Sequence, residues 1–123
     1  MLIIRQDQMN VLSAYMRRSF KDRMVEQLTY KWPEKFEVLT ESGARQLIQR
    51  GVELAAGHGI DRELDIATYI HWMMDYSPEF ETTQEMAWTK ATLDNQELAG
   101  SAKIKSIQRR LPRMVPAGET HSR

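Results

Sequence analysis

Two glycines and a proline divide the middle of this chain into helices. Residues 47–80 read LIQRGVELAAGHGIDRELDIATYIHWMMDYSPEF. Glycine takes the left-handed conformation at which many helices end, so Gly57 and Gly59 predict a helix end beside His58. Pro78 lacks a backbone N–H and restricts the residue before it, so the next helix should end by about Tyr76. This punctuation predicts two helices joined by a tight turn.

The second of these helices has almost no polar face. Asp61 is the expected N-cap, and Glu63 and Asp65 favour the positive end of the helix dipole. Apolar and aromatic side chains fill most of its circumference: Leu64, Ile66, Ala67, Tyr69, Ile70, Trp72, Met73, Met74 and Tyr76. A helix that is apolar on nearly all sides is usually central, and we expect this helix to lie in the core.

Upstream, apolar side chains recur at three- and four-residue steps from about Gln6 to Tyr30, which predicts a long amphipathic helix closed by Trp32-Pro33. These side chains are Met9, Leu12, Met16, Phe20, Met24 and Leu28.

The next helix is expected to start near Thr40, which would act as its N-cap. Gly51 falls inside it, at a cost of about 1 kcal/mol relative to alanine. Close approach by a neighbouring helix would compensate for that cost, and simple tolerance is the alternative.

Downstream, the pattern predicts a short helix over about residues 83–93, ended by Asp94-Asn95, and a last helix over about residues 101–111. Residues 112–123 have two prolines, a glycine and no periodicity, so a disordered tail is expected there. No segment shows the alternation of a strand. The chain is therefore predicted to be all-α, with about five helices in a compact single domain over residues 1–111.

Composition limits the classes of function. The chain has 123 residues and no cysteine, which excludes a disulfide framework, a thiol nucleophile and a thiolate metal site. In the N-terminal stretch MLIIRQDQMN, the apolar run before Arg5 is too short for a signal-peptide core. No apolar run in the chain approaches the roughly 18 residues of a membrane span. We therefore expect a cytoplasmic protein that does not use a membrane.

The formal net charge is zero, but the acidic and basic residues are concentrated in different parts of the chain. Residues 61–100 hold nine acids and two bases, whereas residues 101–123 hold six bases and one acid. Such a chain can close on itself, dimerise head to tail, or offer two faces to partners of opposite charge. A basic tail lying on the acidic body is the simplest of these arrangements.

Candidate catalytic and metal-binding groups do not fall at useful spacings. His58 and His71 are not separated by the three or four residues that place two ligands on one helical face. The acid pairs Glu63 with Asp65, and Glu79 with Glu81, are two residues apart and do not share a helical face. The six glycines match no nucleotide-binding fingerprint. We predict no catalytic, cofactor-binding or metal-binding residues, and no small-molecule substrate.

The acidic stretch after Pro78 is the predicted partner-binding site. It comprises Glu79, Phe80, Glu81, Glu85 and Trp88. Acids accelerate encounter with a basic partner, and an aromatic side chain among them can anchor the complex. The alternative is that Phe80 closes the core just past the helix end, as aromatic residues there often do. The eight methionines can form adaptable binding surfaces, although core packing is their more frequent role.

Residues 15–107 resemble a family of small bacterial helical proteins that are frequently encoded beside type VI secretion effectors, spike proteins and PAAR-type tips. The resemblance rests on Phe20, Asp22-Arg23-Met24, Pro33, Gly51, His58-Gly59-Ile60, Asp65-Ile66, Tyr69-Ile70, Ser77-Pro78-Glu79-Phe80, Trp88 and the LAGSAKIKSI segment. Where that family has Gly-Pro-Asp-Phe-Asp, this chain has Ser77-Pro78-Glu79-Phe80-Glu81, which keeps the acidic and aromatic character. The resemblance implies no catalytic residues and a protein partner, either a toxin or part of its delivery apparatus.

Three classes of function follow. An adaptor or chaperone for a type VI secretion effector is slightly favoured over a cytoplasmic immunity protein that neutralises a toxin. The missing export signal argues against immunity to a cell-wall toxin but not against immunity to a cytoplasmic one. A nucleic-acid binder would use Lys103, Lys105, Arg109, Arg110 and Arg113. The acidic N-terminal end of the helix at 61–76 opposes that third class, because a recognition helix contacts DNA with that end.

Overall fold

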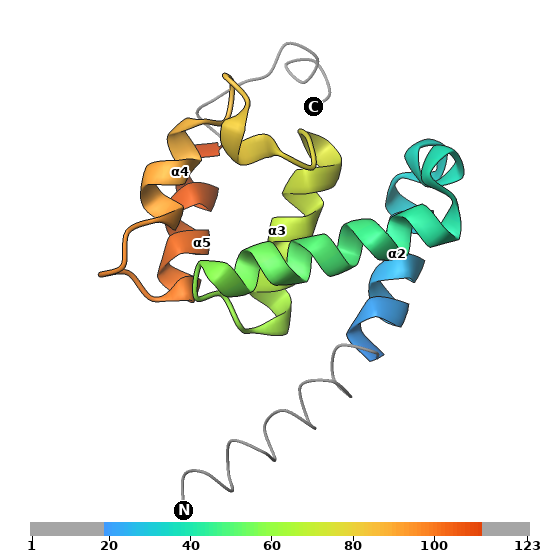
Figure 1. Ribbon diagram of the computed structural model, residues 1–123, viewed down its shortest axis with the longest axis horizontal. Coiled ribbons are helices and arrows are strands. Elements are labelled where there is room, and N and C mark those ends of the chain that lie inside the picture. Colours follow the sequence, from blue (N-terminus) through green and yellow to red (C-terminus); the bar gives the residue numbers. More distant parts are fainter. Residues whose placement is uncertain (1–18, 112–123) are drawn as a thin grey trace, which may run out of the picture. The chain divides into compact units, whose positions relative to one another are not determined.

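The computed structural model describes residues 19–111, and every regular element among them is a helix (Figure 1). Residues 19–31 are helical. They are followed by α2 (Pro33–Gly57), α3 (Glu63–Asp75), the 3-10 helix η1 (Phe80–Thr82), α4 (Trp88–Leu93) and α5 (Gly100–Arg110). This confirms the all-α prediction. None of the helices described is long and apolar enough to cross a membrane.

Some sequence predictions lie outside the described residues. These are the disordered tail at 112–123, with Arg113, and the first part of the helix predicted from Gln6. The chain separates into two compact units, Met1–Arg50 and Gly51–Arg123, and each is treated by itself below. The prediction of one domain over residues 1–111 stays a prediction.

In the first unit, Trp32 separates the helical residues 19–31 from α2, as predicted. The Trp32 amide donates to the carbonyl of Leu28, and the Phe36 amide donates to the carbonyl of Trp32, both within 2.9 Å. The backbone thus keeps its hydrogen bonds through the break. Pro33 opens α2, a position where its missing N–H costs no helical hydrogen bond.

Thr40 interrupts α2 with a non-helical backbone, at φ 67° and ψ 169°. Its hydroxyl accepts a 3.4 Å hydrogen bond from the Gly43 amide, which is the pattern of an N-cap. The predicted helix start near Thr40 is therefore confirmed. The residues between Pro33 and Thr40 are also helical, and this additional piece is absent from the sequence-based prediction.

The helices of the first unit are joined by apolar burial and by one arginine. The predicted stripe Phe20, Met24, Leu28 is buried, as are Ala44, Leu47 and Ile48 of α2. At the surface, the Arg45 guanidinium lies 3.0 Å from both Glu41 and Asp22. The hydrogen bonds that Arg45 donates, first to Glu41 and second to Asp22, raise the pKa of Arg45 above its ordinary value, so its guanidinium stays charged throughout the usual pH range.

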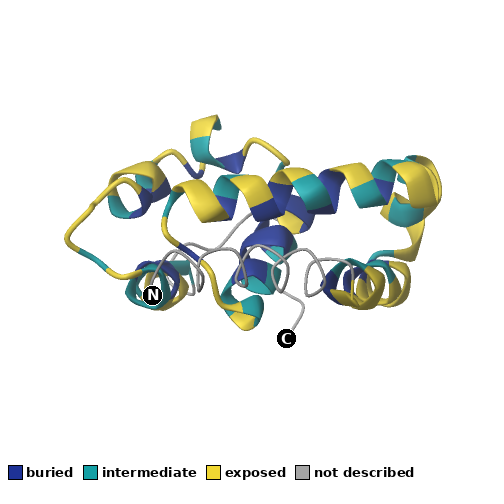
Figure 2. Ribbon diagram, turned by 60° about the horizontal axis from the view of Figure 1, so that its bottom comes forward, coloured by how far each residue is buried: buried dark blue, intermediate teal, exposed yellow. Residues whose placement is uncertain are grey.

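In the second unit, α3 supplies much of the core, as its composition predicts. Its buried residues are Ile66, Tyr69, Ile70, Trp72, Met73 and Met74. Figure 2 colours these helices by burial. Helix α5 packs against α3 and α4, and α4 contacts η1. Leu64 is an exception on α3, since 83% of its surface is exposed although the sequence analysis counts it among the apolar core positions.

Gly51 confirms the expectation of close helix approach. A Cβ atom at this position would lie 2.6 Å from Cγ1 of Ile70 and 3.0 Å from the sulfur of Met73, both on α3. These distances are too short for a side chain of any size. The helix propensity lost at Gly51 is thus offset by packing against α3.

Helix boundaries differ from the predictions at two places. Asp61 is not an N-cap: α3 begins at Glu63, and its N-cap is Arg62, whose side chain makes no capping hydrogen bond. The helix predicted over residues 83–93 is shorter, since α4 starts only at Trp88 and turns occupy residues 84–87. The predicted ends at Tyr76 and Asp94 are confirmed, because both residues are C-caps.

Candidate functional site

The turn that ends α2 is a Schellman motif. The Ile60 amide donates to the carbonyl of Ala55, and the Gly59 amide donates to the carbonyl of Ala56, each at 2.9 Å. Gly59 has φ 79°, the left-handed conformation predicted for it. Ile60 is fully buried, and it occupies the position of this motif that often makes an apolar contact. The motif ends at Ile60 and α3 starts at Glu63, so Asp61 lies in the connection between them.

The first residue of α5 lies directly on this turn. A Cβ atom at Gly100 would be 2.8 Å from Cα of Ile60 and would also collide with the carbonyl oxygen of Gly59. The obstacle is backbone, which cannot rotate away as a flexible side chain can. Two segments far apart in the sequence are therefore in backbone contact, and that contact positions α5.

Lys103 is buried beneath the same turn, with 4% of its surface exposed. Its ammonium donates to the carbonyl of His58 at 2.8 Å and to the carbonyl of Leu93 at 2.6 Å. His58 follows the last residue of α2, and Leu93 is the last residue of α4. The C-terminal ends of helices carry partial negative charge, so both ends stabilise the buried cation.

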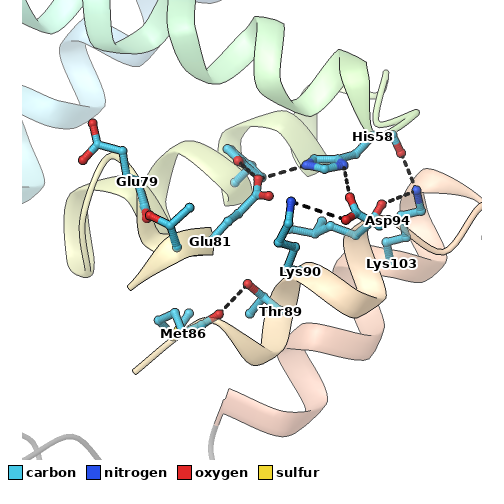
Figure 3. A network of polar contacts seen from close by, with 11 residues as sticks. His58, Glu79, Glu81, Met86, Thr89, Lys90, Asp94 and Lys103 are labelled. Carbon is cyan, nitrogen blue, oxygen red and sulfur yellow. Dashed lines mark hydrogen bonds and ion pairs between the residues drawn. The ribbon is translucent and has the colours of Figure 1, made fainter. Parts of the chain in front are cut away.

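The side chain of His58 connects the turn to two further segments (Figure 3). Its Nε2 lies 2.9 Å from Oε2 of Glu81, and its Nδ1 lies 3.6 Å from Oδ1 of Asp94. The Tyr69 hydroxyl donates to the same Glu81 oxygen. Because an ionised carboxylate can only accept, Glu81 receives hydrogen bonds from both the imidazole and the phenol. The His58 and Glu81 side chains are only 14% and 13% exposed.

We call His58, Tyr69, Glu81, Asp94 and Lys103 the polar junction. Its members come from the end of α2, from α3, from η1, from the end of α4 and from α5. A histidine beside a carboxylate can transfer protons. Here the His58 imidazole, the Tyr69 phenol and the Lys103 ammonium each contact another element of the fold, and Asp94 also pairs with Lys90 of α4 at 3.4 Å. Within the described part of the chain, no group of three His, Cys, Asp or Glu residues is arranged to hold a metal ion.

The residues predicted to bind a partner fall into two groups. Glu79 and Glu85 are exposed, and Trp88 is half-buried. Phe80, by contrast, is 0% exposed and packs against Tyr69 and Trp72, with ring centroids 4.9 and 6.0 Å away. Phe80 therefore closes the core, which is the alternative interpretation. The prediction that Phe80 is an exposed anchor for a partner is wrong. Glu81 is likewise turned inward, toward the polar junction.

Trp88 is covered on one side by a cation. The guanidinium carbon of Arg110 lies 4.2 Å from the centroid of the Trp88 ring. The indole N–H of Trp88 is buried and has no acceptor among residues 19–111. Packing and the guanidinium, rather than a hydrogen bond of the indole, hold this side chain in place.

The basic residues considered for nucleic-acid binding are also divided. Lys105, Arg109 and Arg110 are exposed on α5, whereas Lys103 is buried and cannot reach a phosphate. The burial of Lys103 has a weak signal in the sequence, because it is four residues from Ile107 and one from Ile104 and so borders the apolar stripe. The contact between Tyr69 and Glu81 has no such signal, since it depends on how α3 and η1 pack.

Comparison with protein-family models, with curated proteins and with solved structures gives no match. Two surfaces are candidates for binding: the exposed acids that follow α3, and the pair formed by Trp88 and Arg110.

Proposed function

We propose that this protein is a non-catalytic protein-binding module, and that it acts in the cytoplasm as an adaptor or chaperone for a type VI secretion effector. The observation that carries the proposal is the exposure of Glu79 and Glu85 on either side of a segment that is anchored by the buried Phe80 and by the contacts of Glu81. The resemblance of residues 15–107 to proteins encoded beside such effectors supplies the class of partner.

The acidic surface is supported by a rigid base. Phe80 inserts into the core between Tyr69 and Trp72, and Glu81 is bonded to His58 and Tyr69. The exposed carboxylates on either side therefore project from backbone that is anchored in two ways. A preorganised surface loses less conformational entropy on binding, which favours affinity for a partner of opposite charge.

The polar junction supports a non-catalytic role. Its histidine and its best-buried carboxylate are bonded to each other and to Tyr69, in positions that connect helices rather than open toward a substrate. Breaking these contacts to perform proton transfer would loosen η1 and the end of α2. Structural use of His58 and Glu81 is the simpler account of their geometry.

Co-purification from the native host tests the proposal, with the neighbouring effector and spike genes left intact. The tagged protein should enrich an effector or a spike component, and Glu79→Lys/Glu85→Lys should lose it. A matched control is Asp61→Lys/Glu97→Lys, which reverses two other exposed acids of the same unit and should keep the partner. Recovery of the protein alone, with nothing enriched over a scrambled-surface control, would overturn the proposal.

A second measurement separates adaptor from immunity protein. An adaptor should raise the amount of effector exported without inhibiting the effector's toxic activity in the cytoplasm. Neutralisation of that toxicity by the purified protein, with export unchanged, would replace the adaptor assignment by the immunity one. Association with the purified partner should also slow as salt is raised, because exposed acids act through long-range attraction.

A further inference from the structure

Trp88 and Arg110 form an aromatic and cationic pair at the surface of the second unit. Trp88 opens α4, Arg110 ends α5, and the guanidinium lies over the indole ring at 4.2 Å. Arg110 is exposed, so the edge of its guanidinium can still donate hydrogen bonds while its face is stacked. Tryptophan and arginine are the residue types most enriched among binding hot spots.

An exposed acid precedes Trp88 in the chain. Glu85 is exposed and forms no ion pair within the described part of the chain. It precedes Trp88 by three residues, which limits the separation of their Cα atoms to about 11 Å. The segment between them is fixed, because Met86 is buried and its carbonyl accepts a 2.7 Å hydrogen bond from the Thr89 hydroxyl. We call Glu85, Trp88 and Arg110 the Trp88 surface.

The Trp88 surface carries one base, stacked on the aromatic ring, and one exposed acid three residues before that ring in the chain. Such a surface is complementary to itself: when two copies meet about a two-fold axis, the acid of each copy faces the base of the other. We propose that the Trp88 surface is a self-association site whose occupant is a second copy of this chain. Glu85 of one copy pairs with Arg110 of the other, and the two Trp88 rings meet near the axis.

Charge and burial favour a second copy over a nucleic acid. Arg110 shares α5 with the exposed bases Lys105 and Arg109, but Lys103 is withdrawn into the core and residues 61–100 of the same unit carry nine acids against two bases, which opposes the binding of an extended polyanion. A single carboxylate beside an aromatic ring suits this site better. Exposed ion pairs contribute little by themselves, so the two tryptophans must supply most of the affinity, while the charges set the register.

Self-association would also cover Glu85, which the proposed function assigns to partner binding. A partner would then have to displace the second copy. This inference does not depend on the proposed function, since it concerns the purified chain alone and is tested without any effector.

Sedimentation velocity of the full chain over a range of concentrations tests the inference. The protein should form a concentration-dependent dimer that weakens at high salt. Glu85→Arg and Arg110→Glu should each raise the dissociation constant by at least about tenfold. An equimolar mixture of the two variants should restore the dimer, because the reversed charges then face each other. Trp88→Phe should retain partial dimerisation, whereas Trp88→Ala should abolish it.

Lys105→Glu is the matched control, because it makes the same change of charge on the same helix about 140° around from Arg110. It should dimerise like the parent, and circular dichroism should show every variant folded. A monomer at all concentrations, dimers unaffected by either charge reversal, or a mixture that stays monomeric would each overturn the inference. Loss of the dimer on nuclease treatment would overturn it in favour of a bound nucleic acid.

Discussion

The ammonium of Lys103 donates a 2.8 Å hydrogen bond to the main-chain carbonyl of His58, 45 residues earlier in the sequence. A second bond, to the carbonyl of Leu93, joins the same ammonium to the end of α4. One buried cation therefore connects the C-terminal ends of two helices to α5. Hydrogen bonds from charged donors are stronger than neutral ones, so this connection should contribute substantially to the stability of the second unit.

Replacing Lys103 by methionine should lower the free energy of unfolding by about 2–4 kcal/mol. The variant keeps much of the apolar stem but leaves two buried carbonyls without their donor. Urea denaturation followed by circular dichroism measures the change. Lys105→Met, an exposed position on the same helix, should stay within about 0.5 kcal/mol of the parent. Equal stabilities for the two variants would show that the Lys103 bonds contribute nothing.

Gly59→Val should cost more than about 1 kcal/mol, because valine is forced into the left-handed conformation that the Schellman motif requires. The expected result is a lower melting temperature. Gly57→Val is the control: Gly57 is the last residue of α2, and a Cβ there would meet nothing within 4 Å. A melting temperature for Gly59→Val equal to that of the parent would contradict the assigned turn.

Gly100→Ala should destabilise the protein by about 1–3 kcal/mol through overpacking, since the added methyl collides with the backbone of Gly59 and Ile60. Gly43→Ala adds the same methyl within α2, where its nearest contact is an ordinary 3.5 Å, and should stabilise by about 0.5–1 kcal/mol. Opposite signs in chemical denaturation are the expected outcome. A stabilising Gly100→Ala would mean that α5 does not touch the turn.

Phe80→Ala should lower stability by about 3–5 kcal/mol, because it empties a fully buried site between Tyr69 and Trp72. Leu64→Ala, at an exposed position on α3, should change it by less than about 0.5 kcal/mol. Thermal and urea denaturation compare the two. If Phe80→Ala proves as mild as Leu64→Ala, Phe80 is not part of the core, and its role as an exposed anchor returns.

Local signals in the sequence predicted much of the helical layout. Gly59 and Pro78 act through the backbone of their immediate neighbours, so their positions were enough to place the end of α2 and the end of α3. The apolar repeats of α3 and of residues 20–28 predicted most of their buried residues, but Leu64 is exposed, and Ala67 and Tyr76 are half-buried. The close approach at Gly51 could also be anticipated, since a glycine inside a helix needs a compensating contact.

The candidate site could be anticipated only in part. Glu79 and Glu85 are exposed, as expected for an acidic stretch at the surface. The same stretch also contains Phe80 and Glu81, whose side chains turn inward. Charge and hydropathy in a short segment do not say which side chain faces the core once regular periodicity is lost after Pro78. The missing helix at 83–87 has the same cause.

The sequence by itself determined the fold class, the main helix ends and the split of charge along the chain, because these depend on composition and on neighbours within a few residues. The tertiary structure alone decided the contacts of Glu81 with His58 and Tyr69, the burial of Lys103 between two helix ends, and the stacking of Arg110 on Trp88. Each of these contacts joins residues at least 10 positions apart. Only the packing of α3, α4 and α5 brings such residues within bonding distance, and no local pattern of residues encodes that packing.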